Sequence, residues 1–490
     1  MNSIIKKLRF RYSVIPVQVK ASIWFAVCSI FQKGLSIITV PIFTRLMTTE
    51  QYGYYTTYIS WYNLLLSFTS LNLFFGVFNN AMMKFRDDRW GYISSMQGLV
   101  FVTTSIFFLG YLLFQERINV LFGMPAVLVF MLFLELLMTP ALQFWMAVNR
   151  FEFKYRNIVI VTFLETIINP MMGLFFVLIS EEKGTARIAS IVITEVVICA
   201  VVIVYQFQKG KLFFSKNYWR YALSFNIPLL PHYLSGQVLN QCDRIMISKM
   251  IGNSAVAIYG VAYNIGLLMN IFINAIIGSY TPWFYQNIEK RNYSQIQKVT
   301  KLIVCLMTVL ISGLMLFAPE ALAILGSSEY QEGVYAIPPV VAGTFFFFLY
   351  NIYANIEFYF EKKQYVLLSS IIAAVLNLIL NFIFIPRYGY VAAAYTTLAS
   401  YFVYCMLHNI FAHYICRKEG IPSSIFSLDT VVFATFAVIT GAFFMNILYK
   451  YILVRYGIII IISLIIIWKR DEIITIILNM KKEFGGERAL

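Results

Sequence analysis

Six ionisable side chains lie well inside long apolar segments of this chain, where a charge is costly to place. They are Lys33, Glu135, Glu165, Glu195, Asp243 and Arg244. On insertion scales a charged side chain at the centre of a membrane helix costs at least about 2.5 kcal/mol, so it usually faces a cavity or a partner. Cations in an apolar path suit an anionic group such as a phosphate, and carboxyls suit proton transfer. The pattern indicates movement of a charged molecule through a membrane.

Polar side chains accompany Lys33 along one face of the first apolar segment. Residues that alternate at spacings of four and three share a helix face. The face consists of Ser22, Ala26, Ser29, Lys33 and Ser36. It is small and polar with one cation at its centre, so we expect Lys33 and Ser29 to line a cavity.

The apolar segment at 222–247 carries two neighbouring polar stripes. One consists of Gln237, Gln241, Arg244 and Ser248, and the other of His232, Gly236, Asn240 and Asp243. A helix with two such stripes cannot face lipid on that side. We therefore expect Arg244 to line a cavity together with Gln237, Asn240 and Gln241. Pro228 and Pro231 near its start should bend the helix.

Structural alternatives stay open for most of these groups. Stripes of Ser, Thr and Asn also arise from hydrogen bonds between helices, and Asp243 could simply neutralise a nearby cation. The three glutamates Glu135, Glu165 and Glu195 could relay protons as a group, which would serve ion coupling together with Asp243, or each could be a buried structural acid. His408 and His413 are expected at the membrane interface.

The composition requires a membrane protein. Of 490 residues 60% are hydrophobic and 12% are charged, with a mean hydropathy of +0.74, whereas soluble domains are roughly 25% charged. A membrane helix needs about 20 mainly apolar residues, and the chain has about fourteen such windows. They centre on 21–42, 54–77, 93–114, 124–147, 157–179, 187–207, 222–247, 257–279, 299–318, 334–356, 365–385, 388–413, 428–448 and 451–468. We predict an all-α integral membrane protein with about 14 transmembrane helices.

The basic residues are sorted by side of the membrane. The net charge is +15, but the Lys and Arg residues lie in short joints between windows instead of on one face, so no nucleic acid partner is expected. Of the 38 Lys and Arg residues, 28 fall in the alternate joints that include the N-terminus. The other set of joints holds Arg45, Arg117, Lys183, Arg187, Lys249, Arg387, Lys450 and Arg455. The positive-inside rule then places both termini in the cytoplasm.

Enzyme and metal chemistry find little support in the sequence. The six cysteines show no CxxC spacing, so neither a disulfide framework nor a zinc site is indicated. There is no GxSxG, HExxH or phosphate-loop motif. We therefore expect no enzyme activity, no metal and no cofactor. The basic N-terminus is followed by an apolar window too long for a signal peptide, so we expect it to remain on the protein.

A weak internal repeat divides the chain. Shifting the sequence by 204 residues places the segment that begins at Arg45 over the one that begins at Lys249, with Tyr55 over Tyr259. Six helices separate the copies, so the repeats are parallel. We predict a six-helix lobe at 1–215, a second at 216–420, and two additional helices with a tail at 421–490, with the substrate path between the lobes.

Four segments together resemble the polysaccharide transporter family. They are PIFTRLMTTEQYGYY, SFNIPLLPHYLSGQVLNQCDRIMISKMIG, FAPEALAILGSSEY and LNLILNFIFIPRYGYVAAAYTTLASYFVY. More specifically they are similar to the O-antigen flippases known as Wzx, of the multidrug, oligosaccharidyl-lipid and polysaccharide exporter superfamily. The resemblance covers most of residues 15–415 and rests on the order and spacing of motifs that are each loose.

The resemblance implies a MATE-like transporter of the bacterial inner membrane whose two lobes rock between inward-open and outward-open states. The implied cargo is a lipid-linked oligosaccharide, an undecaprenyl-pyrophosphate-linked O-antigen repeat unit or a related capsule or exopolysaccharide unit. It would move from the cytoplasmic to the periplasmic leaflet, in an ion-coupled manner. Membrane lipid, an O-unit polymerase and a chain-length regulator are the implied partners.

Position suggests which cations would meet the pyrophosphate. The candidates are Lys33, Arg45, Arg244 and Lys249, two from each repeat. Arg45 and Lys249 lie near helix ends, so interface anchoring is an equal alternative for them. Two other functions stay open. A multidrug exporter of the same architecture would favour an acidic path, and a polysaccharide polymerase or ligase would need a large outer loop.

Overall fold

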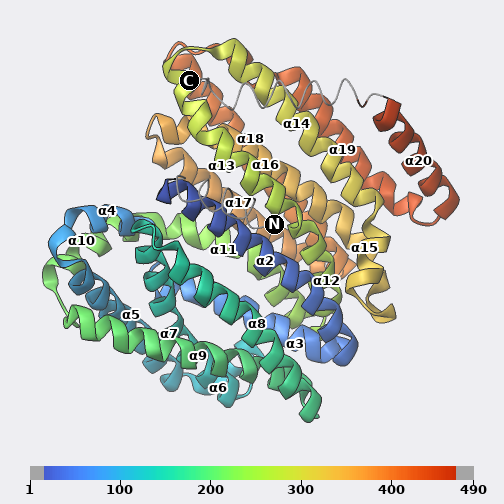
Figure 1. Cartoon of the computed structure of the whole chain (residues 1–490). Helices are drawn as coiled ribbons and strands as arrows, with labels where there is room; N and C mark the ends of the chain where they lie inside the picture. The colour runs from blue at the N-terminus through green and yellow to red at the C-terminus, as the bar shows by residue number, and fades with distance from the viewer. Residues whose placement is uncertain (1–15, 469, 471–490) are drawn as a thin grey trace, which may run out of the picture. The chain divides into compact units, whose positions relative to one another are not determined.

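The computed structural model describes residues 16–468 and residue 470, and its regular elements are α-helices with short 3-10 turns. No strand occurs in these residues (Figure 1). In lipid the backbone must satisfy its own hydrogen bonds within the segment, which a helix does. The predicted all-α class is confirmed. Eight of the terminal basic residues used for the orientation argument lie outside the described residues, namely Lys6, Lys7, Arg9, Arg11, Lys469, Lys481, Lys482 and Arg488.

The chain divides into two compact units, Met1–Gln237 and Val238–Leu490, so the boundary falls inside one helix. The division predicted from the sequence at 215 and 420 remains a prediction.

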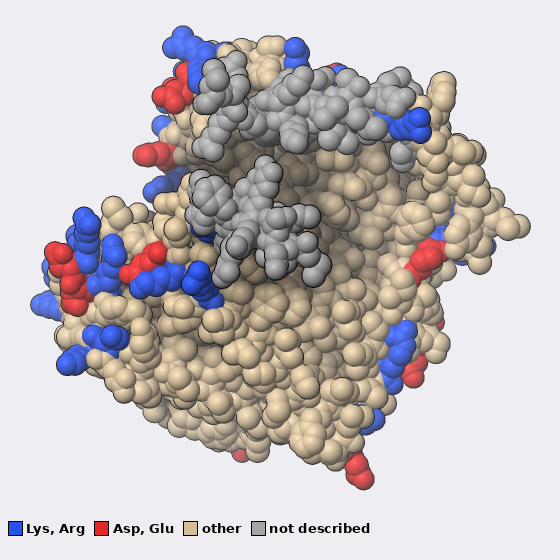
Figure 2. All heavy atoms as spheres, viewed as in Figure 1, with Lys and Arg blue, Asp and Glu red and all other residues tan. Residues whose placement is uncertain are grey.

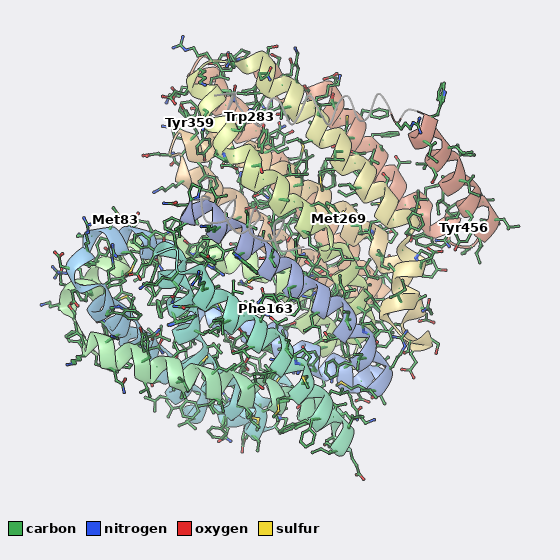
Figure 3. All side chains as sticks on the ribbon, viewed as in Figure 1. Met83, Phe163, Met269, Trp283, Tyr359 and Tyr456 are labelled. Carbon is green, nitrogen blue, oxygen red and sulfur yellow. The ribbon has the colours of Figure 1, made fainter. Side chains whose placement is uncertain are left out.

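The first unit is built around the long helix α9. Its helices are α2 (Val17–Leu46), α3 (Thr49–Thr69), α4 (Val77–Lys84), α5 (Arg89–Leu113), α6 (Gln115–Phe122), α7 (Ala126–Phe151), α8 (Tyr155–Ile179), α9 (Lys183–Gly210), α10 (Lys216–Asn226) and the start of α11 (Leu230–Met250). Helix α9 packs against α5, α7 and α8, and α2 lies along α8. The rings of Phe31 and Phe163 stack between α2 and α8 with centroids 4.2 Å apart (Phe163 is labelled in Figure 3).

The second unit is built around α16 and α18. Its helices after α11 are α12 (Asn253–Leu267), α13 (Met269–Glu289), α14 (Tyr293–Leu316), α15 (Ala318–Leu325), α16 (Ile337–Tyr359), α17 (Lys363–Tyr388), α18 (Tyr390–Lys418), α19 (Leu428–Leu448) and α20 (Ile452–Trp468). Helix α18 packs on α16 and α17, while α19 packs on α14 and α16.

Eleven helical segments of the described chain are long and apolar enough to cross a membrane. The three other predicted windows are helical too, as α3, α11 and α20. Helices α3 and α11 have 21 residues each but are more polar, and α20 has only 17 residues. The protein is thus a multi-pass membrane protein, while the number 14 stays a prediction. Charged side chains of the first unit gather over the end formed by α4 and α10, and a broad uncharged surface follows α8 and α9 (Figure 2).

The internal repeat reappears in the helix boundaries. Helix α2 ends at Leu46 and α11 ends at Met250, while α3 begins at Thr49 and α12 at Asn253. Both pairs of residue numbers differ by 204, the offset at which the sequence overlays itself. Helices α5 and α14 begin at the same offset. The sparse sequence similarity therefore marks a repeated order of helices.

The buried side chain of Asn226 holds the turn that joins α3 to α4. Its Nδ2 atom donates to the carbonyl oxygens of Leu71 and Asn72, both at 3.0 Å, and its Oδ1 accepts from the Val77 N–H at 3.3 Å. Leu71, Asn72 and Gly76 have positive φ angles. At Gly76 a Cβ atom would lie 2.7 Å from the Tyr233 hydroxyl, so only glycine fits without a shift.

An ion pair between a buried arginine and a partly exposed glutamate connects α20 to α15. Arg455, which the sequence places in a joint between apolar windows, is only 3% exposed and donates to both carboxylate oxygens of Glu320, at 2.6 and 2.7 Å. The Tyr456 hydroxyl also donates to Glu320 at 2.6 Å (Tyr456 is labelled in Figure 3). Hydrogen bonds from Arg455 lower the pKa of Glu320 to about 2. The final helix α20 therefore has a specific polar attachment to α15 within the second unit.

We predict that Asn226→Ala destabilises the first unit. The substitution leaves two carbonyls and one N–H of a buried turn without their partner, at a cost of about 1–3 kcal/mol for each group that stays dry. A lower melting temperature of the purified protein in detergent is the expected result. Ser224→Ala is the control, because Ser224 is exposed on the same helix and bonds only its own backbone. Equal melting temperatures for the two variants would contradict this account.

Candidate functional site

Lys33 and its polar stripe lie on an exposed face of α2. Ser22, Ala26, Ser29, Lys33 and Ser36 are all exposed. Within the described part of the chain, Lys33 has no hydrogen-bond or ion-pair partner. An exposed, unpaired ammonium group on an apolar helix requires water or an anionic ligand beside it. Its position suits contact with such a ligand.

Two further candidates for contact with the pyrophosphate, Arg45 and Lys249, are exposed and lie at helix ends. Arg45 in the last turn of α2 donates to the Pro41 carbonyl at 3.0 Å. Lys249 is exposed in the last turn of α11. Basic side chains at these positions also interact favourably with the carbonyl end of a helix. Both geometries are compatible with ligand contact and with anchoring.

The three glutamates of the first unit lie close together, although α7, α8 and α9 each supply one. Glu165 and Glu195 are hydrogen-bonded to each other, and Glu135 is an electrostatic neighbour of Glu195. Glu135 is 2% exposed and accepts from the Tyr58 hydroxyl at 2.7 Å. Two carboxyls can share a hydrogen bond only when one holds a proton. The cluster is therefore chemically able to bind and pass protons.

A polar cavity opens beside this cluster. It has a volume of about 210 Å³ and lies between α2 and α8. Its lining is Gln32, Leu35, Ser36, Thr39, Glu165, Thr166, Asn169 and Pro170. Ser36 belongs to the Lys33 stripe and Glu165 to the carboxyl cluster, so both features meet at one cavity.

Arg187, which the sequence places in a joint between apolar windows, also belongs to this region. It is only 7% exposed and donates to Asn169 Oδ1 at 2.9 Å. Its guanidinium lies over the rings of Phe43 and Tyr55, at 4.5 and 5.5 Å. A Cβ atom at Gly173 would come within 2.4 Å of it. The spacing of Arg187, Ser190 and Thr194 on one face of α9 could have indicated a buried polar stripe.

Arg244 of the second unit is buried and already has partners. Its NH1 donates to the Asn240 carbonyl at 2.7 Å and to Gln241 Oε1 at 3.4 Å. The guanidinium lies over the ring of Tyr263 at 4.3 Å. Asp243 beside it is fully buried and accepts from the Tyr259 hydroxyl and from the Arg244 N–H. Among the described residues the Arg244 guanidinium forms no ion pair with Asp243; Arg244 touches the carboxyl only through its backbone N–H, and its charge acts on Asp243 through space.

A second cavity lies next to Arg244. It measures about 150 Å³ and is lined by Asn240, Tyr263, Leu267, Asn270, Val340, Thr344, Phe347, Thr397 and Tyr401. Arg244 bonds to Asn240 and stacks on Tyr263, so it supports the wall of the cavity. Gln237 and Gln241 are partly exposed. The hydroxyls of Tyr263 and Tyr401 each lie 3.4 Å from Asn240 Oδ1.

The structure therefore brings together two groups of predicted residues. The glutamates form one group in the first unit, and Asp243, Arg244, Asn240 and Gln241 form another in the second. Lys33 and Arg45 belong to the first unit, while Arg244 and Lys249 belong to the second. A path joining all four cations remains a proposal.

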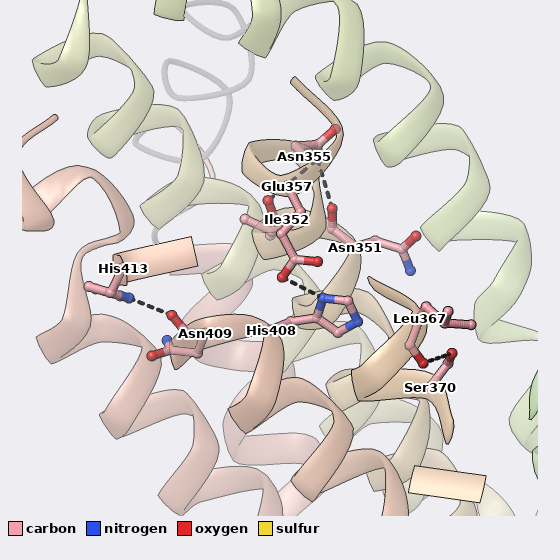
Figure 4. A network of polar contacts seen from close by, with 9 residues as sticks. All are labelled: Asn351, Ile352, Asn355, Glu357, Leu367, Ser370, His408, Asn409 and His413. Atoms are coloured by element: carbon pink, nitrogen blue, oxygen red, sulfur yellow. Dashed lines mark hydrogen bonds and ion pairs between the residues drawn. The ribbon is translucent and has the colours of Figure 1, made fainter. Parts of the chain in front are cut away.

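His408 was expected at the membrane interface, which stays a prediction, but its side chain does not face the surroundings of the protein. Its side chain is fully buried, and its Nδ1 lies 2.8 Å from Oε1 of the fully buried Glu357 (Figure 4). Glu357 lies 51 residues earlier on another helix, so spacing along one helix could not reveal the pair. His413 is partly buried and contacts the Asn409 carbonyl of its own helix at 2.8 Å.

Sequence families match both units. A family described as polysaccharide biosynthesis protein matches residues 19–288, and the MatE family matches residues 228–383. The chain is also similar to a Haloferax volcanii protein named "Probable low-salt glycan biosynthesis flippase Agl15". The two are 23% identical over 411 residues, which are 81% of this chain and 83% of that protein.

Two solved structures have a similar fold. An inward-facing multidrug resistance MATE family transporter matches 82% of this chain and 99% of its own, with a TM-score of 0.62 and 12% identity. The lipid II flippase MurJ in an inward closed conformation matches 92% of this chain and 100% of its own, with a TM-score of 0.60 and 16% identity. The predicted MATE-like fold is confirmed.

We predict that Arg244→Ala destabilises the protein more than Arg244→Lys does. Alanine removes the hydrogen bonds from the guanidinium to Asn240 and Gln241, which for a charged donor are worth about 1.5–3 kcal/mol each, and it removes the cation that acts on the buried Asp243. Lysine keeps the charge and loses the stacking on Tyr263, worth about 0.5–2 kcal/mol. Melting temperatures in detergent should fall in the order wild type, lysine, alanine, with exposed Lys249→Ala as the control. An alanine variant as stable as wild type would contradict the assigned role.

Proposed function

Because the chain belongs to the polysaccharide biosynthesis protein family, we propose that it is a flippase that moves a lipid-linked oligosaccharide across a membrane by alternating access. Agl15, similar over most of both chains, is named as a glycan biosynthesis flippase. The observation that carries the proposal is the exposed Lys33 on the membrane-length helix α2, which has no ion-pair partner among the described residues. A cation placed there matches an anionic phosphate better than a cationic or neutral cargo.

The proposed cargo is an undecaprenyl-pyrophosphate-linked O-antigen repeat unit or a related polysaccharide unit. It would pass from the cytoplasmic to the periplasmic leaflet of a bacterial inner membrane, with both termini of the protein in the cytoplasm. Lys33 and Arg45 of the first unit and Arg244 and Lys249 of the second are the proposed contacts along its path. Arg244 would act mainly through Asn240 and Tyr263, because its own guanidinium is engaged.

Ion coupling is part of the proposal. Glu135, Glu165 and Glu195 are proposed to exchange protons in the first unit, since the Glu165 and Glu195 carboxyls hydrogen-bond each other beside a polar cavity. Asp243 is proposed as a further coupling group. Its carboxylate already has the Tyr259 and Arg244 contacts, so neutralising Arg244 is the simpler role for it.

The proposed cargo also indicates which partner proteins to expect. Exported repeat units are consumed by polymerisation, so an O-unit polymerase and a chain-length regulator are proposed partners. The lobes would be 1–215 and 216–420, with 421–490 as an addition that carries the last two helices. No catalytic activity is proposed.

A multidrug exporter is the second candidate, favoured by the fold shared with a MATE family transporter. Such a cargo is often cationic, and the positive charge of Lys33 would repel it. Sensitivity of a deletion strain to cationic drugs separates the two functions. Increased sensitivity with normal surface polysaccharide would favour the exporter.

The flippase proposal is tested most directly by deleting the gene. Complete lipid-linked repeat units should then accumulate in the cytoplasmic leaflet, and surface polysaccharide should be lost. Purified protein in liposomes should also move a fluorescent lipid-linked oligosaccharide between leaflets. A deletion strain with normal surface polysaccharide would overturn the proposal.

We predict that Lys33→Gln reduces surface polysaccharide at least about tenfold, the effect of losing about 1.4 kcal/mol of charge-assisted binding. Lys33→Arg should retain most export, because it keeps the positive charge. Ser22→Ala on the same exposed face is the control. Polysaccharide is compared at equal amounts of membrane-inserted protein. Full complementation by the glutamine variant would exclude a role for the Lys33 charge.

A further inference from the structure

The second unit contains a sealed acid–histidine pair that the proposed function does not use. Glu357 in α16 and His408 in α18 are both fully buried, with His408 Nδ1 and Glu357 Oε1 2.8 Å apart. Their outer atoms, Glu357 Oε2 and His408 Nε2, have no hydrogen-bond partner in the described chain. Buried polar atoms normally have partners, so this pair needs an explanation beyond packing.

The surroundings of the pair are aromatic and uncharged. The rings of Tyr350 and Tyr404 lie 5.2 and 4.7 Å from the His408 ring. Tyr350 of α16 and Tyr404 of α18 are the titratable side chains of these two helices that contact the pair among the described residues. Helix α17 contributes the uncharged Ser370 to the same region (Figure 4). Among the described residues, His408 is the charged or titratable group that interacts with the Glu357 carboxyl, by a hydrogen bond and electrostatically. Within residues 16–468 and 470, no Lys or Arg forms an ion pair with Glu357 or His408.

This setting fixes how many protons the closed pair holds. With two protons the pair is net neutral, either as carboxylate and imidazolium or as carboxylic acid and imidazole, and in both forms Nε2 carries a hydrogen. With one proton, on Nδ1, the pair carries a net negative charge. A net charge buried without a partner is far more costly than a neutral pair. The closed unit therefore favours the form with two protons.

Water entry changes this number. Separately hydrated glutamate and histidine have ordinary pKa values of about 4.3 and 6.5, so above about pH 6.5 they hold one proton between them. Opening of α16 against α18 would then release one proton from Nε2, and closing would take one up. The equilibrium between closed and open forms should shift tenfold per pH unit above about pH 6.5, with the closed form favoured at lower pH.

We propose that Glu357 and His408 form a proton-binding site that couples proton uptake to closure of the second unit. The link to transport rests on the proposed flippase function, whereas proton binding itself does not. The site is separate from the carboxyl cluster of the first unit. It makes the proton the coupling ion of the second unit.

Hydrogen exchange of the full-length protein in liposomes tests the proton site. Protection of peptides covering 350–360 and 402–412, corrected for the intrinsic pH dependence of exchange, should fall up to tenfold per unit between about pH 6.5 and 8.5. The double variant Glu357→Gln with His408→Gln should lose this dependence, since two amides can bond each other without a titrating proton. The single variant His408→Gln should lose the dependence as well, and it serves if the double variant does not fold. The measurement on the wild type requires no substitution.

His413→Gln is the matched control, because His413 lies on the same helix and contacts only a backbone carbonyl of that helix. It should keep the wild-type pH dependence. A wild type without pH-dependent protection, or a double variant or His408→Gln variant that retains it, would overturn the proposal. So would a His413→Gln variant that loses it.

A transport assay separates this inference from the function on which it rests. The wild type in liposomes could show pH-dependent protection that the double variant loses, and yet move no lipid-linked oligosaccharide at any pH. That result would support the proton site and overturn the flippase function. Movement of oligosaccharide without any pH-dependent protection would overturn the proton site alone.

Discussion

In the apolar interior of a membrane, a hydrogen-bonding or charged group without a partner costs several kcal/mol, and the internal organisation of both units follows from this constraint. Three buried arginines of the described chain are stabilised by different sets of partners. Arg455 binds a carboxylate, Arg187 combines an amide with two aromatic rings, and Arg244 combines a carbonyl with one ring and a neighbouring carboxylate. These contacts set which helices can pack together.

The same constraint explains where helices are interrupted. The turn between α3 and α4 exposes backbone groups that lipid cannot satisfy, and the buried amide of Asn226 supplies the missing donor and acceptor. Such a turn is tolerated only where protein or water covers it. An interruption beside polar side chains therefore marks the side of a helix that faces the interior of the unit.

The sequence predicts those features that depend on one helix at a time. Apolar length identified the helices, and residue spacing placed Lys33 on a polar face and Arg244 beside Asn240 and Gln241. The offset of 204 residues recurs in the helix boundaries. The family resemblance is confirmed by the match to residues 19–288.

Contacts between helices could not be predicted in the same way. Glu135 and Tyr58 are 77 residues apart, and Glu357 and His408 are 51 apart. A stripe shows which side of a helix is polar but not which other helix covers it. Spacing along one helix therefore does not show that Arg187 and Arg455 are buried, nor which helix covers His408.

The partners of a charged side chain also distinguish charges that stabilise the fold from charges that can bind a ligand or exchange a proton. A guanidinium remains protonated in any conformation, so Arg455 with Glu320 can hold a helix but cannot respond to pH near neutrality. Lys33 has no partner within the described chain, and its charge is available to a ligand. The Glu165–Glu195 and Glu357–His408 pairs are different again, because each depends on a proton that can leave once water enters. A transporter that uses ion gradients requires charges of this third kind, and in each unit they lie between helices whose separation would expose them.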